Sequence, residues 1–183
     1  PRSHFALHET YANQIIRDVS EGRAELGFMY ISNYNDRVIM HALDQAELNF
    51  RSLFVSQPCV YVRADHPLAK KDRIKMSDMD PFYRVQHEQG MEGSTYFAEE
   101  PLASVPHARN VWVSDNETLL YLLHNGTAYT LATGVYMGGD DIVSIPLEDG
   151  EYMNVGVVFR ADRTESTLAR DFMTLLGRRV VAQ

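Results

Sequence analysis

Residues 62–81 read VRADHPLAKKDRIKMSDMDP, and this stretch divides the chain into two parts. The β-rich run before it, residues 59–62, stops at a turn that holds the sequence HPLA at residues 66–69. A basic spacer follows, and then a short capped segment at Ser77-Asp78-Met79. The rhythm of strands and helices restarts here, which predicts two successive α/β units. We interpret the His-Pro pair as structural residues that set the turn.

The size and charge of the chain narrow its class. Its 183 residues, 45% of them hydrophobic, can form one ordinary domain or two small lobes. There are 17 basic and 25 acidic residues, a formal charge of −8. A surface that binds duplex DNA needs an excess of Lys and Arg to offset the phosphates. The composition therefore argues against direct nucleic-acid binding by this part of the protein.

The number of cysteines and the length of the apolar runs indicate where in the cell the protein is located. The single cysteine, Cys59, excludes an intramolecular disulfide and fits a reducing cytosol, so we expect a cytoplasmic protein. Because Cys59 stands beside Pro58 in an apolar strand, we interpret it as a buried structural thiol. The sequence contains no run of 18 apolar residues and therefore predicts no membrane span. The first residues also lack the apolar core of a signal peptide. Strand-like sequence begins almost at Pro1, so we expect a fragment of a longer protein.

The first part of the chain predicts alternating strands and helices. The apolar run at residues 26–31 is continuous, which is typical of a parallel strand buried on both faces. Helical spacing after Thr10, a candidate cap, predicts a helix that Gly22 ends. This order predicts an α/β sheet with right-handed crossovers. The predicted strands span residues 5–7, 26–31 and 48–54, and a second helix contains Val38, Ile39 and Leu43.

The second part of the chain repeats the pattern. One helix is predicted at residues 95–103, and another at residues 117–124 with Asp115 or Asn116 as its cap and Gly126 at its end. Six strands are predicted, at residues 60–63, 83–86, 111–114, 129–132, 142–145 and 155–159. A final amphipathic helix over residues 164–179 places Leu168, Phe172, Leu175 and Leu176 on one face.

The order and spacing of these segments resemble the effector-binding domain of LysR-type transcriptional regulators. In that family an HPLA turn, a polar spacer and a DL or DM pair follow the first strand of the second subdomain, as at residues 66–79. Residues 16–27, IRDVSEGRAELG, resemble the family pattern V-x-x-G-x-x-x-x-G. Residues 115–126 resemble the family helix that leads to a late glycine. One departure is the run TLAT at residues 130–133, where the family usually has Ile-Val-Pro.

The resemblance implies an α/β fold of two Rossmann-like lobes, of the periplasmic-binding-protein type II kind. The first lobe would comprise residues 1–55 plus 161–183, and the second residues 56–160. In the family a strand and a helix precede the strand expected at residues 5–7, and a winged helix-turn-helix that contacts DNA precedes the domain. Neither is found in this sequence. The implied function is effector sensing for transcription regulation, not catalysis.

The resemblance also implies self-assembly. Two family domains pack side by side and antiparallel, with a first-lobe helix against the partner's second lobe, so we expect a homodimer or homotetramer. The candidate interface residues are Ile15, Ile16 and Tyr121. DNA would be bound only through the N-terminal domain, and no membrane contact and no cofactor are expected.

Candidate effector-binding residues follow several of the predicted strands. Ligands of open α/β sheets bind beyond the carboxyl ends of the strands, where free N–H groups at helix N-termini favour anions. Hydroxyls and amides at these places suit a small polar effector, an anionic one included. The candidates are Thr10, Tyr11, Tyr30, Ser32, Gln86, His87, Thr130 and Thr133.

Two other classes remain open at this point. A free solute-binding protein of a transport system shares the fold but normally carries a secretion signal or lipobox. A small α/β enzyme would need converging titratable groups with perturbed pKa values, for example His87 near Glu9. The sequence shows no zinc-enzyme histidine spacing, no nucleophile elbow and no Walker-type loop, so we predict no catalytic and no metal-binding residues.

Overall fold

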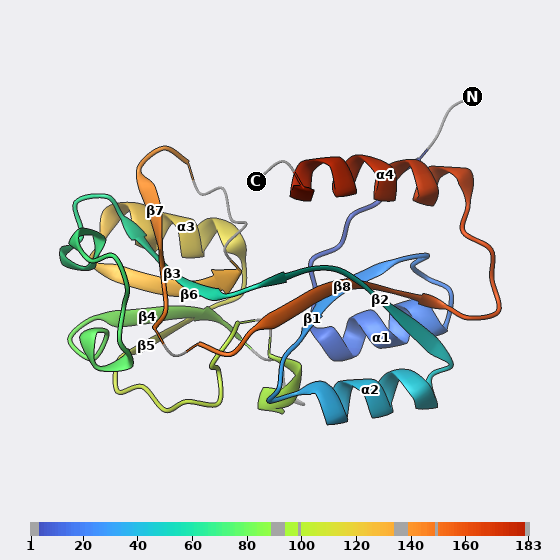
Figure 1. The fold of residues 1–183 in the computed structure, drawn as a ribbon, viewed down its shortest axis with the longest axis horizontal. Coiled ribbons are helices and arrows are strands. Elements are labelled where there is room, and N and C mark those ends of the chain that lie inside the picture. Colours follow the sequence, from blue (N-terminus) through green and yellow to red (C-terminus); the bar gives the residue numbers. More distant parts are fainter. Residues whose placement is uncertain (1–3, 89–93, 99, 134–138, 149, 182–183) are drawn as a thin grey trace.

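The computed structural model describes residues 4–88, 94–98, 100–133, 139–148 and 150–181, with side chains up to residue 178. Two sheets lie at opposite ends of an elongated molecule (Figure 1). The three-stranded sheet has the order β1-β8-β2 and the five-stranded sheet the order β5-β4-β6-β3-β7. The first sheet contains β1 (Gly27–Ile31), β2 (Leu48–Ser56) and β8 (Met153–Arg160). The second contains β3 (Pro58–Arg63), β4 (Tyr83–His87), β5 (Asn110–Val113), β6 (Ala128–Thr133) and β7 (Ile142–Pro146).

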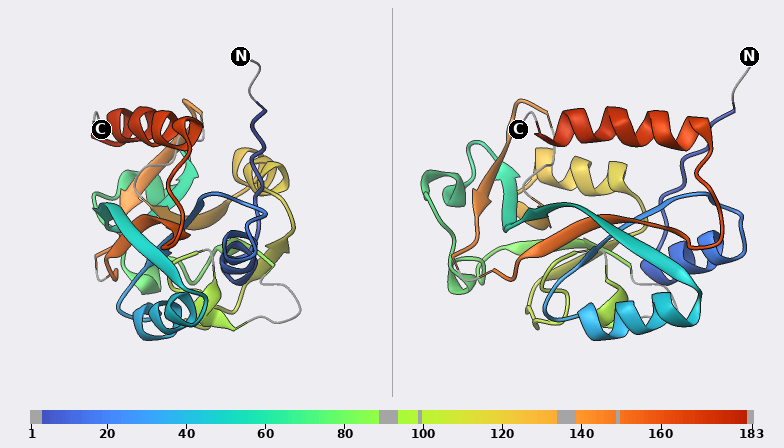
Figure 2. Two further views of the ribbon diagram at one scale, coloured as in Figure 1. Left: turned by 90° about the vertical axis from the view of Figure 1, so that its right-hand side faces the viewer. Right: turned by 45° about the vertical axis from the view of Figure 1, so that its right-hand side comes forward.

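The three-stranded sheet carries helices on both sides. β8 runs antiparallel to β1 and to β2, so β1 and β2 are parallel to each other and α2 (Asp36–Gln45) connects them. α1 (Ala12–Ser20) and α2 lie on one face, and α4 (Thr167–Val181) lies on the other side, as Figure 2 shows. The prediction that β1 pairs in parallel and is buried on both faces is wrong. Its described neighbour is antiparallel, and alternate residues of β1 are fully and partly buried.

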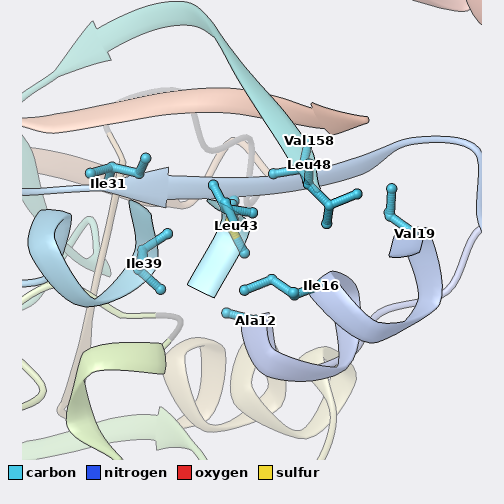
Figure 3. Close-up of a cluster of buried hydrophobic side chains, with 9 residues drawn as sticks. Ala12, Ile16, Val19, Ile31, Ile39, Leu43, Leu48 and Val158 are labelled. Carbon is cyan, nitrogen blue, oxygen red and sulfur yellow. The ribbon is translucent and has the colours of Figure 1, made fainter. Parts of the chain in front are cut away.

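Apolar side chains from both helices and from the sheet form the core of this part. α1 places its buried residues at helical spacing and turns them toward α2 and the strands (Figure 3). Full burial of one Val, Leu or Ile side chain stabilises the fold by about 1.5–3 kcal/mol. The cluster consists of Ala12, Ile16, Val19, Met29, Ile31, Ile39, Leu43, Leu48 and Val158.

The five-stranded sheet is mixed. β4 runs parallel to β5 and β6, whereas β3 runs antiparallel to β6 and β7. α3 (Asn116–Asn125) covers one face, and the side chain of Asp115 accepts a hydrogen bond from the Thr118 N–H at the start of this helix. Asp115 is thus the cap, one of the two residues that the sequence proposed, and Gly126 ends the helix as predicted.

Two neighbouring chain segments connect the sheets. Gln57 alone separates β2 from β3, so this segment runs almost without interruption from one sheet to the other. The return segment lies beside it, because Cys59 pairs with Pro146 in one sheet and Ser56 pairs with Met153 in the other.

The HPLA turn lies between β3 and a basic spacer. Residues Pro67–Lys70 form one turn of 3-10 helix, and His66 precedes it with only 2% of its surface exposed. The Nδ1 atom of His66 accepts a hydrogen bond from the Leu68 N–H, and Nε2 lies 3.2 Å from the Thr127 carbonyl oxygen. His66 is therefore part of the structure of this turn, as we interpreted it.

Three local predictions are wrong. Residues 5–7 form no strand, because no described strand lies beside them. The helix expected at residues 95–103 is reduced in its described part to a 3-10 turn at Thr95–Phe97, and Tyr11 instead of Thr10 is the N-cap of α1. The last predicted helix is confirmed as α4, and its apolar face is partly covered: Phe172 packs against Phe5 and Phe28, whereas Leu175 is 61% exposed.

Candidate functional site

A small pocket of about 80 Å³ lies between the two sheets. The first sheet contributes the end of β1 and the loop after it, and the second part contributes residues 95–105. None of the described residues that line this pocket is Lys, Arg or His, and their polar side chains carry hydroxyls and two carboxylates. The lining residues are Tyr30, Ser32, Tyr34, Thr95, Glu100, Pro101, Leu102, Ala103, Ser104, Val105, Glu151 and Met153.

A chain of hydrogen bonds crosses this pocket at Glu100. From the first sheet, the Tyr30 hydroxyl donates to the carbonyl oxygen of Glu100 at 3.1 Å. The buried carboxylate of Glu100 accepts a bond from the backbone N–H of His87 at 2.8 Å, and its Oε1 lies 2.6 Å from the His87 Nδ1. Glu100 therefore links a residue of β1 to a residue of β4.

A second link involves Tyr34, which follows β1. The Tyr34 hydroxyl lies 2.8 Å from the Thr95 hydroxyl, and its ring stacks on Tyr96 with centroids 4.8 Å apart. The backbone N–H of Tyr34 donates to the Glu151 carboxylate at 3.2 Å and to the Ser32 hydroxyl at 3.2 Å. Ser32 is thus both a wall of the pocket and part of the turn that presents Tyr34.

The other predicted residues of the second part lie away from both described hollows. Gln86 is 1% exposed, and neither polar atom of its side chain has a hydrogen-bond partner among the described residues. The Thr130 hydroxyl donates to the carbonyl oxygen of Val85 at 2.8 Å, and the Thr133 carbonyl accepts from the Tyr61 hydroxyl at 2.5 Å. Thr130 therefore has a structural role in this arrangement, whereas Gln86 is a buried polar group that no described residue satisfies.

A larger cavity of about 1000 Å³ lies beside the edge of β1 that no described strand covers. Thr10 and Tyr30 line it, while Tyr11 does not. α1 contributes Ile15, and α4 contributes Ala169 and Phe172. Residues 4–10 form a further wall. The cavity is therefore bounded by the segment predicted to be a strand and by one face of α4.

The proposed interface residues differ in exposure. Ile16 is 8% exposed and belongs to the core, Ile15 is half-buried, and Tyr121 on α3 is 65% exposed. Of the three, Tyr121 therefore offers the largest free surface.

Burial shifts the pKa of several groups near the second sheet. Desolvation lowers the pKa of the Arg84 guanidinium, against the opposing effects of Tyr129 and Glu100. Burial raises the pKa of Tyr129 to about 12 and raises that of the Cys59 thiol, which is buried as predicted. Burial thus favours the neutral forms of Tyr129 and Cys59, whereas it disfavours the charge of Arg84, whose guanidinium donates hydrogen bonds to Leu102, Val105 and Asn110.

The described residues show neither a metal site nor a membrane helix. No cluster of three His, Cys, Asp or Glu residues within them could hold a metal ion. None of the helices in the described ranges has the length and apolar character that a bilayer crossing requires.

Sequence reasoning missed Tyr34, Glu100 and Glu151. The sequence signal that could have indicated Tyr34 is its position in the polar loop directly after β1, where Ser32 was found. Glu100 gave no such signal, because its segment was expected to be helical. Glu9, the proposed partner of His87, is exposed, and Glu100 occupies that position instead.

Solved structures of similar fold come from regulatory proteins. HinK, a LysR family transcriptional regulator from Pseudomonas aeruginosa, is 12% identical with a TM-score of 0.59; the match covers 91% of this chain and 56% of HinK. The chain thus spans a little over half the length of that regulator. The effector binding domain of QuiR in complex with shikimate is 14% identical with a TM-score of 0.61, and the match covers 92% of this chain and 78% of that one. The CcmR regulatory domain of Synechocystis PCC6803 in complex with 2-PG is 17% identical with a TM-score of 0.61, and the match covers 92% of this chain and 79% of that one.

The family comparison covers almost the whole sequence. No curated protein matches the chain. The LysR substrate binding domain family matches residues 1–180, and its members are regulatory domains, not enzymes. The fold is the α/β, periplasmic-binding-protein type II-like fold of these effector domains. This chain belongs to the LysR substrate-binding domain family.

Proposed function

We propose that this domain senses a small molecule that binds between the two sheets and thereby controls a LysR-type transcription regulator. The observation that carries the proposal is the pair of links across the pocket, Tyr30 to Glu100 and Tyr34 to Thr95. Two relatives of the same fold hold shikimate and 2-PG. A ligand that fits one spacing of these groups better than another would favour that arrangement of the two parts.

We propose that the two parts act as lobes, residues 1–55 plus 161–183 and residues 56–160. β8 (Met153–Arg160) lies entirely within the second of these ranges, although it pairs with β1 and β2 of the first sheet. A ligand changes the balance between two lobe arrangements only through a difference in its affinity for them. The hydrogen bonds of Tyr30 with Glu100 and of Tyr34 with Thr95 are contacts between the two parts in the arrangement described here.

The chemistry of the pocket bears on the effector. Its hydroxyls can donate to or accept from a polar ligand, which supports a small hydroxylated molecule. Since none of the described lining residues is cationic, an anionic group of the effector would need a partner outside this set of residues. We propose that Gln86 and His87 meet the ligand only when the lobes change their arrangement.

We further propose that an extended strand occupies the cavity beside β1, as the family resemblance implies for a segment before residue 5. β1 is at the edge of the described sheet, and an edge strand can pair with a further strand. The apolar walls from residues 4–10 and α4 are consistent with such a strand. A version of the protein extended at its N-terminus should then unfold at a higher temperature than residues 1–183, with the amides of β1 protected from hydrogen exchange.

Assembly, DNA binding and compartment are also proposals. We propose a homodimer or homotetramer with Tyr121 near its interface, DNA contact through a separate N-terminal domain, and a cytoplasmic location. Exposure of Tyr121 and the formal charge of −8 support the first two.

A thermal-shift screen tests the proposed function. The panel contains shikimate and common central metabolites, each at millimolar concentration. A ligand at 100 times its dissociation constant adds about 2.7 kcal/mol of stability if it binds only the folded state. The shift should shrink in Tyr30→Phe and persist in Tyr152→Phe, since Tyr152 is exposed and does not line the pocket. An equal loss in both variants would contradict the proposed site.

A further inference from the structure

The segment of residues 100–105 contacts both parts of the molecule. Its first residue, Glu100, accepts a bond from Tyr30 of β1 through its carbonyl and from His87 of β4 through its carboxylate. All six residues line the pocket between the sheets. Any change in the spacing of the sheets or in the content of the pocket must therefore act on this segment, which we call the 100–105 turn.

Arg84 holds the 100–105 turn from the second sheet. Its guanidinium donates to the carbonyl oxygens of Leu102 at 3.3 Å and Val105 at 3.1 Å, and to the Asn110 side chain at 3.1 Å. Arg84 is 5% exposed. Burial of a charged guanidinium is unfavourable unless hydrogen bonds compensate for the lost water. Arg84 therefore keeps two of its hydrogen bonds only while the 100–105 turn holds its present conformation.

Leu102, in the middle of the turn, has an unfavourable backbone conformation. Its φ is +60°, in the left-handed region that bulky side chains rarely adopt. Its carbonyl oxygen also accepts a bond from the Val105 N–H at 2.9 Å, which closes the turn. The only other non-glycine residue with positive φ in the described part of the chain is Glu47, at +54°, which is exposed and does not line the pocket.

Strained residues persist only where their surroundings impose the conformation, and they often lie at switching elements. We infer that the 100–105 turn is the two-state element of this domain, strained at Leu102 by its contacts with Arg84 and Tyr30 in the arrangement described here and relaxed in a second arrangement of the sheets. This inference rests on the proposed function. The turn would convert the presence of a ligand in the pocket into a change of lobe spacing, with Arg84 and Glu100 as positioning residues.

Paired substitutions isolate the backbone strain from the loss of the side chain. Leu102→Ala removes the leucine but keeps a Cβ atom, whereas Leu102→Gly also relieves the positive φ. The same pair at Glu47 is the matched control. Spin labels on Arg37→Cys in α2 and Glu117→Cys in α3, in a Cys59→Ala background, report the distance between the two parts without ligand.

Leu102→Gly should shift the distance distribution toward the described arrangement relative to Leu102→Ala. We expect the ratio of the two populations to change about tenfold, which corresponds to about 1.4 kcal/mol. The Glu47 pair should leave the distribution unchanged. Identical distributions for the two Leu102 variants, or equal changes at both sites, would overturn the inference. Because no ligand is used, this result is independent of the metabolite screen, and failure of one does not imply failure of the other.

Discussion

The imidazole of His66 accepts a hydrogen bond from the Leu68 N–H at 3.1 Å, and its ring lies against Phe82 with centroids 4.5 Å apart. The Nδ1 atom must be unprotonated to accept this bond, which leaves the proton on Nε2 facing Thr127. A single buried histidine thereby organises the HPLA turn that follows β3.

The first prediction concerns pH. Burial lowers the pKa of His66 below its usual 6.5. Below about pH 6.5 the unfolded chain therefore binds more protons than the folded one. The free energy of unfolding then decreases as the pH is lowered, until the pH passes the folded-state pKa of His66. Urea unfolding between pH 7.5 and 5 should show this loss. His66→Asn should reduce the slope, and His41→Asn, on the exposed face of α2, should leave it unchanged. An unaltered slope in His66→Asn would refute the assignment.

The second prediction concerns the contact of α1 with β1. A Cβ atom at Gly27 would overlap the Ile15 side chain and lie 3.1 Å from the Val19 methyl group. Gly27→Ala should destabilise the protein by about 1–3 kcal/mol, as overpacking does. Chemical denaturation measures the change. Ile15→Ala in the same chain should recover part of it, because the two sites are coupled.

Gly177 in α4 is the matched control for Gly27. An added Cβ meets no atom within 4 Å there. Gly177→Ala should stabilise by about 0.5–1 kcal/mol through helix propensity alone. Destabilisation at both positions would mean that the packing between α1 and β1 is not the cause.

The third prediction concerns Gln86. A buried amide without partners costs about 1–3 kcal/mol relative to a bonded one. Gln86→Met should therefore stabilise the ligand-free domain. Gln57→Met should destabilise it, because the Gln57 amide donates to the Leu147 carbonyl at 2.6 Å. Thermal unfolding compares the two variants. A loss of stability in Gln86→Met would show that its amide has partners in solution.

The fourth prediction separates structural from ligand-binding threonines. Thr130→Val preserves shape but leaves the Val85 carbonyl without its donor, so the domain should lose about 1–3 kcal/mol. Thr133→Val should cost less, because Thr133 contributes its backbone carbonyl to the bond with Tyr61. Denaturant titrations of the two variants give the comparison, and equal losses would argue against the Thr130 bond.

The alternation of strands and helices could be predicted because it depends on local patterns. The runs at β1 and β3, the cap at Asp115 and the end at Gly126 are all encoded within a few residues. Burial of Cys59 followed from the same pattern.

Features that depend on distant neighbours could not be predicted. Residues 5–7 have the composition of a strand, but strand formation needs a partner. The apolar face of α4 has the right spacing, but burial needs a surface to cover it. Glu100 contacts both Tyr30 and His87, which lie in other segments of the sequence. No local sequence pattern predicts these contacts.

The connection between the sheets constrains how they can move. β2 pairs with β8 from Leu48 and Arg160 to Ser56 and Met153, with a register shift between Ser52 and Phe54, and β3 continues beside β7. Gln57, between β2 and β3, marks the place where one of these segments passes from one sheet to the other. The register shift itself lies within the three-stranded sheet, opposite Gly156 and Val155, which also pair with β1. We expect bending at the connection to cost less than sliding of the two segments past each other, because sliding would break the ladders of hydrogen bonds in both sheets.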